Sequence, residues 1–126
     1  NKIYIINRSF KKLKTWPEVN KVNKLKKFPN NENLNAIINA TPIGMVQIKK
    51  KEFLLKINLK KTKFYFECVV SPKKTQNINI ARHNSIKTIP GYKISIEQAK
   101  IQFKLYVKKK ISSKFIKKTL NEALLD

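Results

Sequence analysis

Short apolar segments and longer polar or amphipathic segments alternate along the chain. The apolar segments are rich in β-branched and aromatic residues and are bounded by asparagine, serine, proline or glycine, so each is typical of a buried strand. They lie at residues 2–6, 36–39, 63–70 and 85–89. Because short buried strands separated by helical segments favour a parallel sheet, the pattern predicts an α/β fold.

Two amphipathic helices are predicted at the C-terminal end. The first has one apolar stripe, which consists of Ile96, Ala99, Phe103, Tyr106 and Val107. Ser112 can cap the second, whose stripe consists of Phe115, Ile116, Leu120, Ala123 and Leu124. The pattern therefore predicts helices with a single apolar face each.

The other segments are less regular. Ser9 can cap a short helix that runs through Leu13, and Pro17 ends that region. Residues 18–35 are polar and asparagine-rich, and they hold either a weak strand or a short helix. A short helix or an apolar turn is expected at 53–59, and a helix at 75–83.

The charge is strongly positive, with 29 basic against 7 acidic residues and a net charge of +22. A protein with this much positive charge attracts polyanions, so an RNA-associated or ribosomal-type protein is one interpretation. Lysine is spread along nearly every segment, however, and the only arginines are Arg8 and Arg82. Abundant lysine, asparagine and isoleucine share A- and T-rich codons, so composition explains the charge better than a nucleic-acid partner does.

The single cysteine, Cys68, excludes a disulfide framework and fits a reducing, cytoplasmic compartment. We expect its thiol to act as a small apolar filler. Apolar runs are too short to span a bilayer, so no membrane partner is expected. The only histidine, His83, ends a predicted helix and is interpreted as a surface or capping group rather than a catalyst.

The first strand ends in Asn7, Arg8 and Ser9, with no acidic residue. Where a dinucleotide is bound, an acid at the end of such a strand holds the ribose 2′-hydroxyl, whereas an arginine accommodates a 2′-phosphate. A guanidinium binds phosphate in a bidentate way, and Lys11 and Lys12 would add donors. The alternative is an ordinary turn after a strand.

Two longer sequence motifs point to a family more specifically than the Asn-Arg-Ser segment does. Residues 39–45 read Asn-Ala-Thr-Pro-Ile-Gly-Met after a strand, and residues 91–99 read Gly-Tyr-Lys-Ile-Ser-Ile-Glu-Gln-Ala before Gln-Phe-Lys-Leu-Tyr at 102–106. The first string closely resembles the Asn-(Ala/Thr)-Thr-Pro-x-Gly-Met loop of the shikimate dehydrogenases. The second is similar to that family's Gly-Leu-Gly-Met-Leu-x-x-Gln-Ala segment and the Gln-Phe-x-Leu-Trp after it. The strings keep the family's order, and the resemblance covers essentially the whole chain.

The resemblance implies NADPH-dependent reduction of 3-dehydroshikimate to shikimate in aromatic amino-acid biosynthesis, with NADP as cofactor. It implies a partial Rossmann-like parallel sheet flanked by helices, followed by two C-terminal helices. The implied cofactor-binding residues are Asn7, Arg8, Ser9, Lys12, Thr41 and Gly91, and Gln98 would bind a substrate hydroxyl. Thr41 and Met45 would line the crevice, and Gly91 would approach the nicotinamide.

The resemblance also implies a missing half. Residues 1–92 would be a partial NADP-binding domain without its first strand and Gly-rich loop, and residues 93–126 would be helices that pack toward an N-terminal substrate domain. That domain, in cis or in a separate chain, would carry the family's catalytic lysine and aspartate. We therefore assign no catalytic residue and no metal ligand here, and we expect sequence upstream of Asn1.

Some positions depart from the family pattern. Val70 replaces a tyrosine that contacts substrate, Lys93 replaces the second glycine of the Gly-x-Gly-Met string, and Glu67 conservatively matches an acid. A lysine at 93 would crowd the nicotinamide pocket. Three alternatives stay open. The chain is an inactive remnant of the enzyme, a quinate-using relative, or another protein of the same fold with the same phosphate-binding arginine (the arginine clamp), such as a glutamyl-tRNA reductase.

Overall fold

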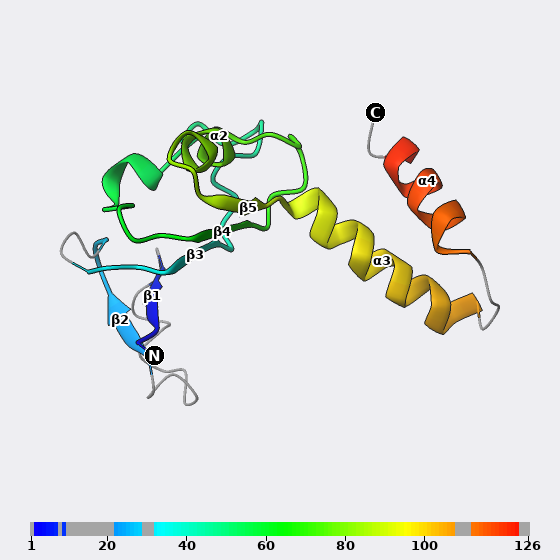
Figure 1. The fold of residues 1–126 in the computed structure, drawn as a ribbon, viewed down its shortest axis with the longest axis horizontal. Coiled ribbons are helices and arrows are strands. Elements are labelled where there is room, and N and C mark those ends of the chain that lie inside the picture. The colour runs from blue at the N-terminus through cyan, green and yellow to red at the C-terminus, as the bar shows by residue number, and fades with distance from the viewer. Residues whose placement is uncertain (1, 8, 10–21, 29–31, 108–111, 124–126) are drawn as a thin grey trace.

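The computed structural model describes residues 2–7, 9, 22–28, 32–107 and 112–123, and it confirms the α/β fold (Figure 1). The strands are β1 (Tyr4–Ile6), β2 (Asn23–Leu25), β3 (Ala36–Asn39), β4 (Phe64–Glu67) and β5 (Lys87–Ile89). The helices are the short 3-10 helix η2 (Leu54–Lys56) and the α-helices α2 (Gln76–His83), α3 (Gly91–Val107) and α4 (Ser113–Ala123).

All strand pairs among the described residues are parallel, and they form two sheets. Strand β1 pairs with β2, and β4 pairs with β3 on one side and with β5 on the other. In the larger sheet Asn39 lies opposite Glu67, and Tyr65 lies opposite both Ile37 and Thr88. Because neighbouring positions in register point to the same face, these side chains share one face of the sheet.

The hydrophobic core covers that face. Tyr65 and Ile37 pack with side chains from α2 and from the segment around η2, so that the core cluster is Ile37, Phe53, Leu54, Ile57, Tyr65, Ile78, Ala81 and Ile86. Of the two structures expected for residues 53–59, a short helix or an apolar turn, the short helix is the one that forms. Leu54 is fully buried, whereas its neighbour Leu55 is 70% exposed.

Polar side chains hold the starts of α2 and η2, the two helical segments that pack on the core face of the sheet. Thr75 caps α2, since its Oγ1 accepts a hydrogen bond from the Ile78 amide at 3.2 Å. Asn77, buried in the first turn of α2, accepts hydrogen bonds through Oδ1 from the amides of Phe53 at 2.9 Å and Leu54 at 3.3 Å. The start of η2 is therefore attached to α2 by a side chain rather than by backbone pairing.

The two C-terminal helices extend away from the larger sheet and lie beside each other (Figure 1). Ser112 caps α4 as expected, because its Oγ accepts a hydrogen bond from the Phe115 amide at 3.1 Å. The apolar stripes are only partly covered: Ile96 and Ile116 are buried, but Tyr106 is 83% exposed. Among the described helices, none is both long and apolar enough to cross a membrane.

Several boundaries differ from the expected ones. The strand expected at 85–89 begins at Lys87, because Ser85 has a φ of +56° and forms a turn after α2. The strand expected at 63–70 ends at Glu67. Helix α3 begins at Gly91, five residues before Ile96, the first residue of the apolar stripe predicted for it. The weak element expected within 18–35 is β2, and the helix expected at 9–13 lies outside the described residues, apart from Ser9.

Candidate functional site

The carboxyl ends of β3, β4 and β5 meet at one edge of the larger sheet. Thr41 follows β3, Cys68 follows β4, and Gly91 follows β5. In an open parallel sheet, ligands bind in the crevice outside this edge. The string at 39–45 and the start of the string at 91–99, both recognised in the sequence, are therefore brought to the same edge by strand pairing.

Asn39 shapes the loop that follows β3. Its Oδ1 accepts hydrogen bonds from the amide of Thr41 at 3.1 Å and from the hydroxyl of Thr41 at 2.6 Å. Its Nδ2 donates to the carbonyl of Ile43 at 2.9 Å. The hydroxyl of Thr41 also accepts from the Ile43 amide at 3.2 Å. Thr41 is exposed, but its hydroxyl proton goes to Asn39, so this oxygen is open to a ligand only as an acceptor.

Glu67 connects this loop to the rest of the edge. Its side chain is fully buried, and Oε1 accepts hydrogen bonds from Asn39 Nδ2 at 2.7 Å and from the Val69 amide at 3.3 Å. Its Oε2 accepts from the hydroxyls of Tyr65 at 2.8 Å and Thr75 at 3.0 Å. Four donors thus satisfy a carboxyl group that would otherwise be costly to bury. They tie β3, β4, the segment after β4 and the start of α2 to one side chain.

Tyr65 has a strongly raised pKa. Burial is the main cause, because it disfavours the phenolate, and the charge of Glu67 and the hydrogen bond to it act in the same direction. Above about pH 10 a tyrosine in the unfolded chain loses its proton, whereas Tyr65 in the folded chain keeps it. The folded state then binds more protons than the unfolded state, so this contribution to stability is lost as the pH rises.

We therefore expect Tyr65→Phe to have a shallower loss of stability at alkaline pH than the unchanged chain. The difference in slope should approach about 1.4 kcal/mol per pH unit above pH ~10. Urea unfolding at a series of pH values between neutral and alkaline measures it, and the comparison cancels the titration of the lysines. Parallel pH profiles for the two proteins would contradict the assignment of a buried, protonated Tyr65.

Gly91 lies against the backbone that follows β4. A Cβ atom at this position would come within 2.3 Å of the Val69 carbonyl oxygen and 2.8 Å of the Cys68 carbonyl carbon. Since these are backbone atoms, they cannot rotate away. Close packing within the protein thus explains the need for glycine at 91, apart from the approach to the nicotinamide that the resemblance implies.

The other expected site residues are spread more widely. The Ser9 amide donates to Asn7 Oδ1 at 2.7 Å, and Arg8 and Lys12 lie outside the described residues. Gln98 is exposed on α3, seven positions after Gly91, or about 10 Å along the helix axis. The hydrogen bonds around Glu67 do not extend to Asn7, Ser9 or Gln98.

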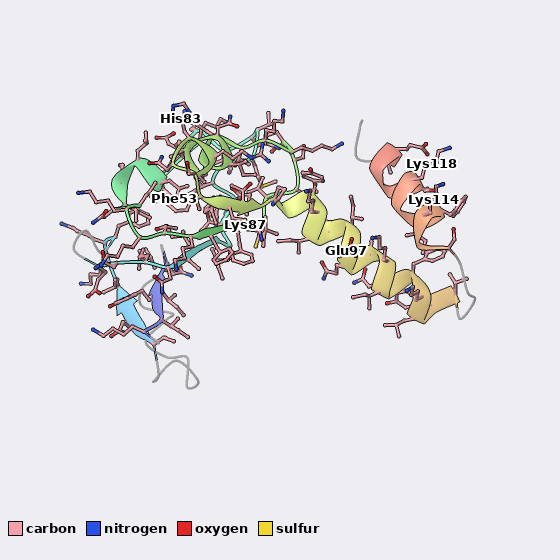
Figure 2. The ribbon with its side chains drawn as sticks, in the orientation of Figure 1. Phe53, His83, Lys87, Glu97, Lys114 and Lys118 are labelled. Atoms are coloured by element: carbon pink, nitrogen blue, oxygen red, sulfur yellow. The ribbon has the colours of Figure 1, made fainter. Side chains whose placement is uncertain are left out.

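The positions of Cys68 and His83 test the roles that the sequence predicted for them. Cys68 is exposed, so the expectation of a buried apolar filler was wrong: the residue follows the last strand position, where the alternation of buried and exposed side chains turns it outward. His83, labelled in Figure 2, is exposed at the end of α2, in agreement with a surface role.

Sequence reasoning missed the part played by Tyr65 and Thr75. The available signal was an acid, Glu67, at the end of an otherwise aromatic strand segment, since a buried carboxyl group needs several donors nearby. Nothing in the linear pattern told which hydroxyl groups would supply them.

Comparison with solved structures identifies the fold. The chain matches a shikimate 5-dehydrogenase-like protein with a TM-score of 0.80 and 23% identity, over 94% of this chain and 44% of that one. It matches quinate dehydrogenase from Corynebacterium glutamicum, solved in complex with NAD, with a TM-score of 0.75 and 17% identity, over 96% and 46%. A chorismate mutase/shikimate 5-dehydrogenase fusion protein from Clostridium acetobutylicum gives 0.69 and 22%, over 99% and 47%.

No protein-family model matches the chain, and no curated protein matches it. The chain spans about half the length of the solved structures. At these identities the likeness establishes the fold: the chain has the Rossmann-like half of the shikimate and quinate dehydrogenase structures, as the sequence strings predicted.

Proposed function

We propose that this chain is the NADP-binding part of a shikimate dehydrogenase, an oxidoreductase that reduces 3-dehydroshikimate to shikimate with NADPH. The main support is the loop at 39–45, which Asn39 and Glu67 hold at the carboxyl edge of a parallel sheet. This edge is where open α/β sheets bind nucleotides. Residues 1–92 would bind the cofactor, and residues 93–126 would pack toward a substrate domain.

In this proposal Asn7, Arg8, Ser9 and Lys12 bind the adenosine 2′-phosphate of NADP. The Ser9 amide donates to Asn7 Oδ1 directly after β1, the place where such a phosphate would lie. NADPH would supply the hydride and leave as NADP⁺. The chain's own groups hold the cofactor and exclude water from it, and they transfer no proton.

The remaining assignments concern the other end of the crevice. Thr41 and Met45 would line it, Gly91 would lie near the nicotinamide, and Gln98 would donate to or accept from a substrate hydroxyl. Gln98 and Met45 are both exposed, so they are free to meet a ligand. Lys93 is exposed in the first turn of α3, which leaves room for its side chain to turn toward solvent. The catalytic residues would come from the other half of a cytoplasmic enzyme, and the chain by itself would be inactive.

Arg8→Ala tests the choice of cofactor. In the complete protein that contains this chain, we expect the variant to bind NADPH at least about tenfold more weakly, since a hydrogen bond between charged groups contributes about 1.5–3 kcal/mol. NADH affinity should stay unchanged, because NADH has no 2′-phosphate. Fluorescence titration of both cofactors measures the two dissociation constants.

Arg82→Ala is the matched control, because it removes the same charge from the end of α2, where Arg82 Nε donates to Thr88 Oγ1. If both variants changed the two affinities equally, the effect would be general electrostatics and the arginine clamp would be wrong. If the complete protein bound neither cofactor, the inactive remnant would be the better interpretation.

A further inference from the structure

Lys51 is bound to the loop that follows β3, at the carboxyl edge of the larger sheet. Its Nζ donates hydrogen bonds to the Met45 carbonyl oxygen at 2.9 Å and to the Val46 carbonyl oxygen at 2.6 Å. These two residues form the tip of the loop, and both are exposed. Lys51 takes no part in the hydrogen bonds around Glu67, and the proposed function assigns it no role.

The first half of the loop is held by contacts with the sheet and with α2. Asn39 Nδ2 donates to the Ile43 carbonyl at 2.9 Å. Gly44 has a φ of +109°, a conformation that L side chains rarely adopt, and a Cβ atom here would lie 3.2 Å from the Thr75 Cβ. The loop is therefore fixed as far as Gly44 without any contribution from Lys51.

The tip is packed less tightly than the first half of the loop. Val46 is 67% exposed and Met45 is 37% exposed. Two turn hydrogen bonds support the tip, from the Met45 amide to the Pro42 carbonyl at 3.0 Å and from the Ile48 amide to the Met45 carbonyl at 3.2 Å. Exposed backbone hydrogen bonds with few apolar contacts open readily. The position of the tip therefore depends on the two bonds from Lys51.

An ammonium group suits this place. It carries three N–H donors, so it can bind two carbonyl oxygens at once, and its charge strengthens both bonds. Because Lys51 lies six positions after Met45 and five after Val46, the two bonds close a ring across the far side of the loop. Water competes for such exposed contacts, so they contribute little to the stability of the fold. Their effect is to restrict the geometry of the tip.

We propose that Lys51 is a positioning residue of the candidate site, whose ammonium holds Met45 and Val46 in the place where a ligand meets them. The inference rests on the proposed function, in which Met45 lines the end of the crevice near the nicotinamide. Lys51 acts through the loop backbone rather than by contact with the cofactor. Its influence should therefore fall on the nicotinamide half of the cofactor and not on the adenosine half.

Amide exchange in the complete protein that contains this chain tests the loop without any ligand. Lys51→Met keeps most of the length of the side chain but removes its donors. In this variant we expect the amides of Met45 and Ile48 to exchange at least about threefold faster. The Ile86 amide, bonded in the turn after α2, should keep its rate. Lys50→Met is the matched control, since it removes the same charge from an exposed neighbouring position.

Titration with two ligands measures the functional effect. We expect Lys51→Met to weaken NADPH binding at least about threefold, because binding must then order the tip of the loop. Binding of adenosine 2′,5′-bisphosphate, which lacks the nicotinamide, should stay unchanged.

Chemical rescue tests the need for the ammonium itself. The variant is Lys51→Cys in a protein whose other cysteines, Cys68 included, are replaced by serine. Alkylation with 2-bromoethylamine restores an ammonium at nearly the length of lysine, so the exchange rates and the NADPH affinity should return toward those of the protein with Lys51. Alkylation with iodoacetamide adds no charge and should not restore them.

Equal exchange at Met45 and Ile48 in Lys51→Met and Lys50→Met would overturn the inference. Equal weakening of NADPH and adenosine 2′,5′-bisphosphate would also overturn it, because a general loss of positive charge produces that result. Full rescue by iodoacetamide would contradict the role of the ammonium. If the unchanged protein bound no NADPH, the proposed function would fail, and the exchange rates with their rescue would still decide whether Lys51 holds the tip.

Discussion

Replacing Glu67 by alanine is expected to lower the free energy of unfolding by about 3–5 kcal/mol, because it breaks a buried hydrogen-bond network and leaves several donors unpaired. The carboxyl group accepts hydrogen bonds from Asn39, Val69, Tyr65 and Thr75, and its side chain is fully buried. Alanine would leave those donors without an acceptor and would open a cavity. Because a domain of this size is stabilised by only about 5–15 kcal/mol, this loss would be a large share of its stability.

Urea denaturation followed by circular dichroism measures this loss. Glu122→Ala is the matched control: it also removes one carboxylate, but Glu122 is exposed on α4 and makes only a 3.9 Å contact with Lys118. Its effect should stay within about 0.5 kcal/mol. Similar losses for the two variants would show that the network around Glu67 contributes little.

The same variant should loosen the loop at 39–45. Asn39 would keep its bonds to Thr41 and Ile43 but lose the 2.7 Å bond that holds it to β4. We expect Glu67→Ala to accelerate exchange of the Thr41 amide more than exchange of the Ile86 amide, which donates to the Ala81 carbonyl and has no bond to this network. Hydrogen exchange read residue by residue separates this local effect from general destabilisation.

Gly91→Ala is expected to cost about 2–4 kcal/mol, because overpacking costs about 1–3 kcal/mol and more where backbone is involved. The new Cβ atom would meet the Val69 carbonyl oxygen at 2.3 Å, so either β4 or the start of α3 must move. The helix preference of alanine offsets at most about 1 kcal/mol of this cost. Urea denaturation measures the loss, and Lys93→Ala, at an exposed position in the same helical turn, should be nearly neutral.

This variant also has a functional consequence that differs from simple instability. Under the proposed assignments, a shift of α3 would move Gln98 but not the phosphate-binding residues after β1. The proposal therefore predicts that Gly91→Ala, in the complete protein, weakens substrate binding more than it weakens binding of the adenosine end of the cofactor. Equal loss of both, with a normal stability, would indicate that Gly91 is needed for the nicotinamide itself.

Much of the edge that forms the candidate site could be predicted from residue order. The predicted apolar runs ended in Asn39, Val70 and Ile89, and the strands β3, β4 and β5 end at Asn39, Glu67 and Ile89. Parallel pairing brings such ends together whatever the loops contain. The string at 39–45 therefore indicated a crevice loop from the sequence alone. The exposure of Cys68 could not be predicted, because it depends on whether the strand ends at 67 or at 70.

By itself, the sequence determined the α/β class, the cap at Ser112 and the approximate strands, because these depend on neighbours within a few positions. Only the tertiary structure decided which donors surround Glu67 and why Gly91 must be glycine, since those contacts join segments far apart in the chain. It also decided that Ile38 on β3 is exposed. The sequence predicts that an apolar strand residue such as Ile38 is buried, and only the packing of the whole domain shows whether another layer lies against it.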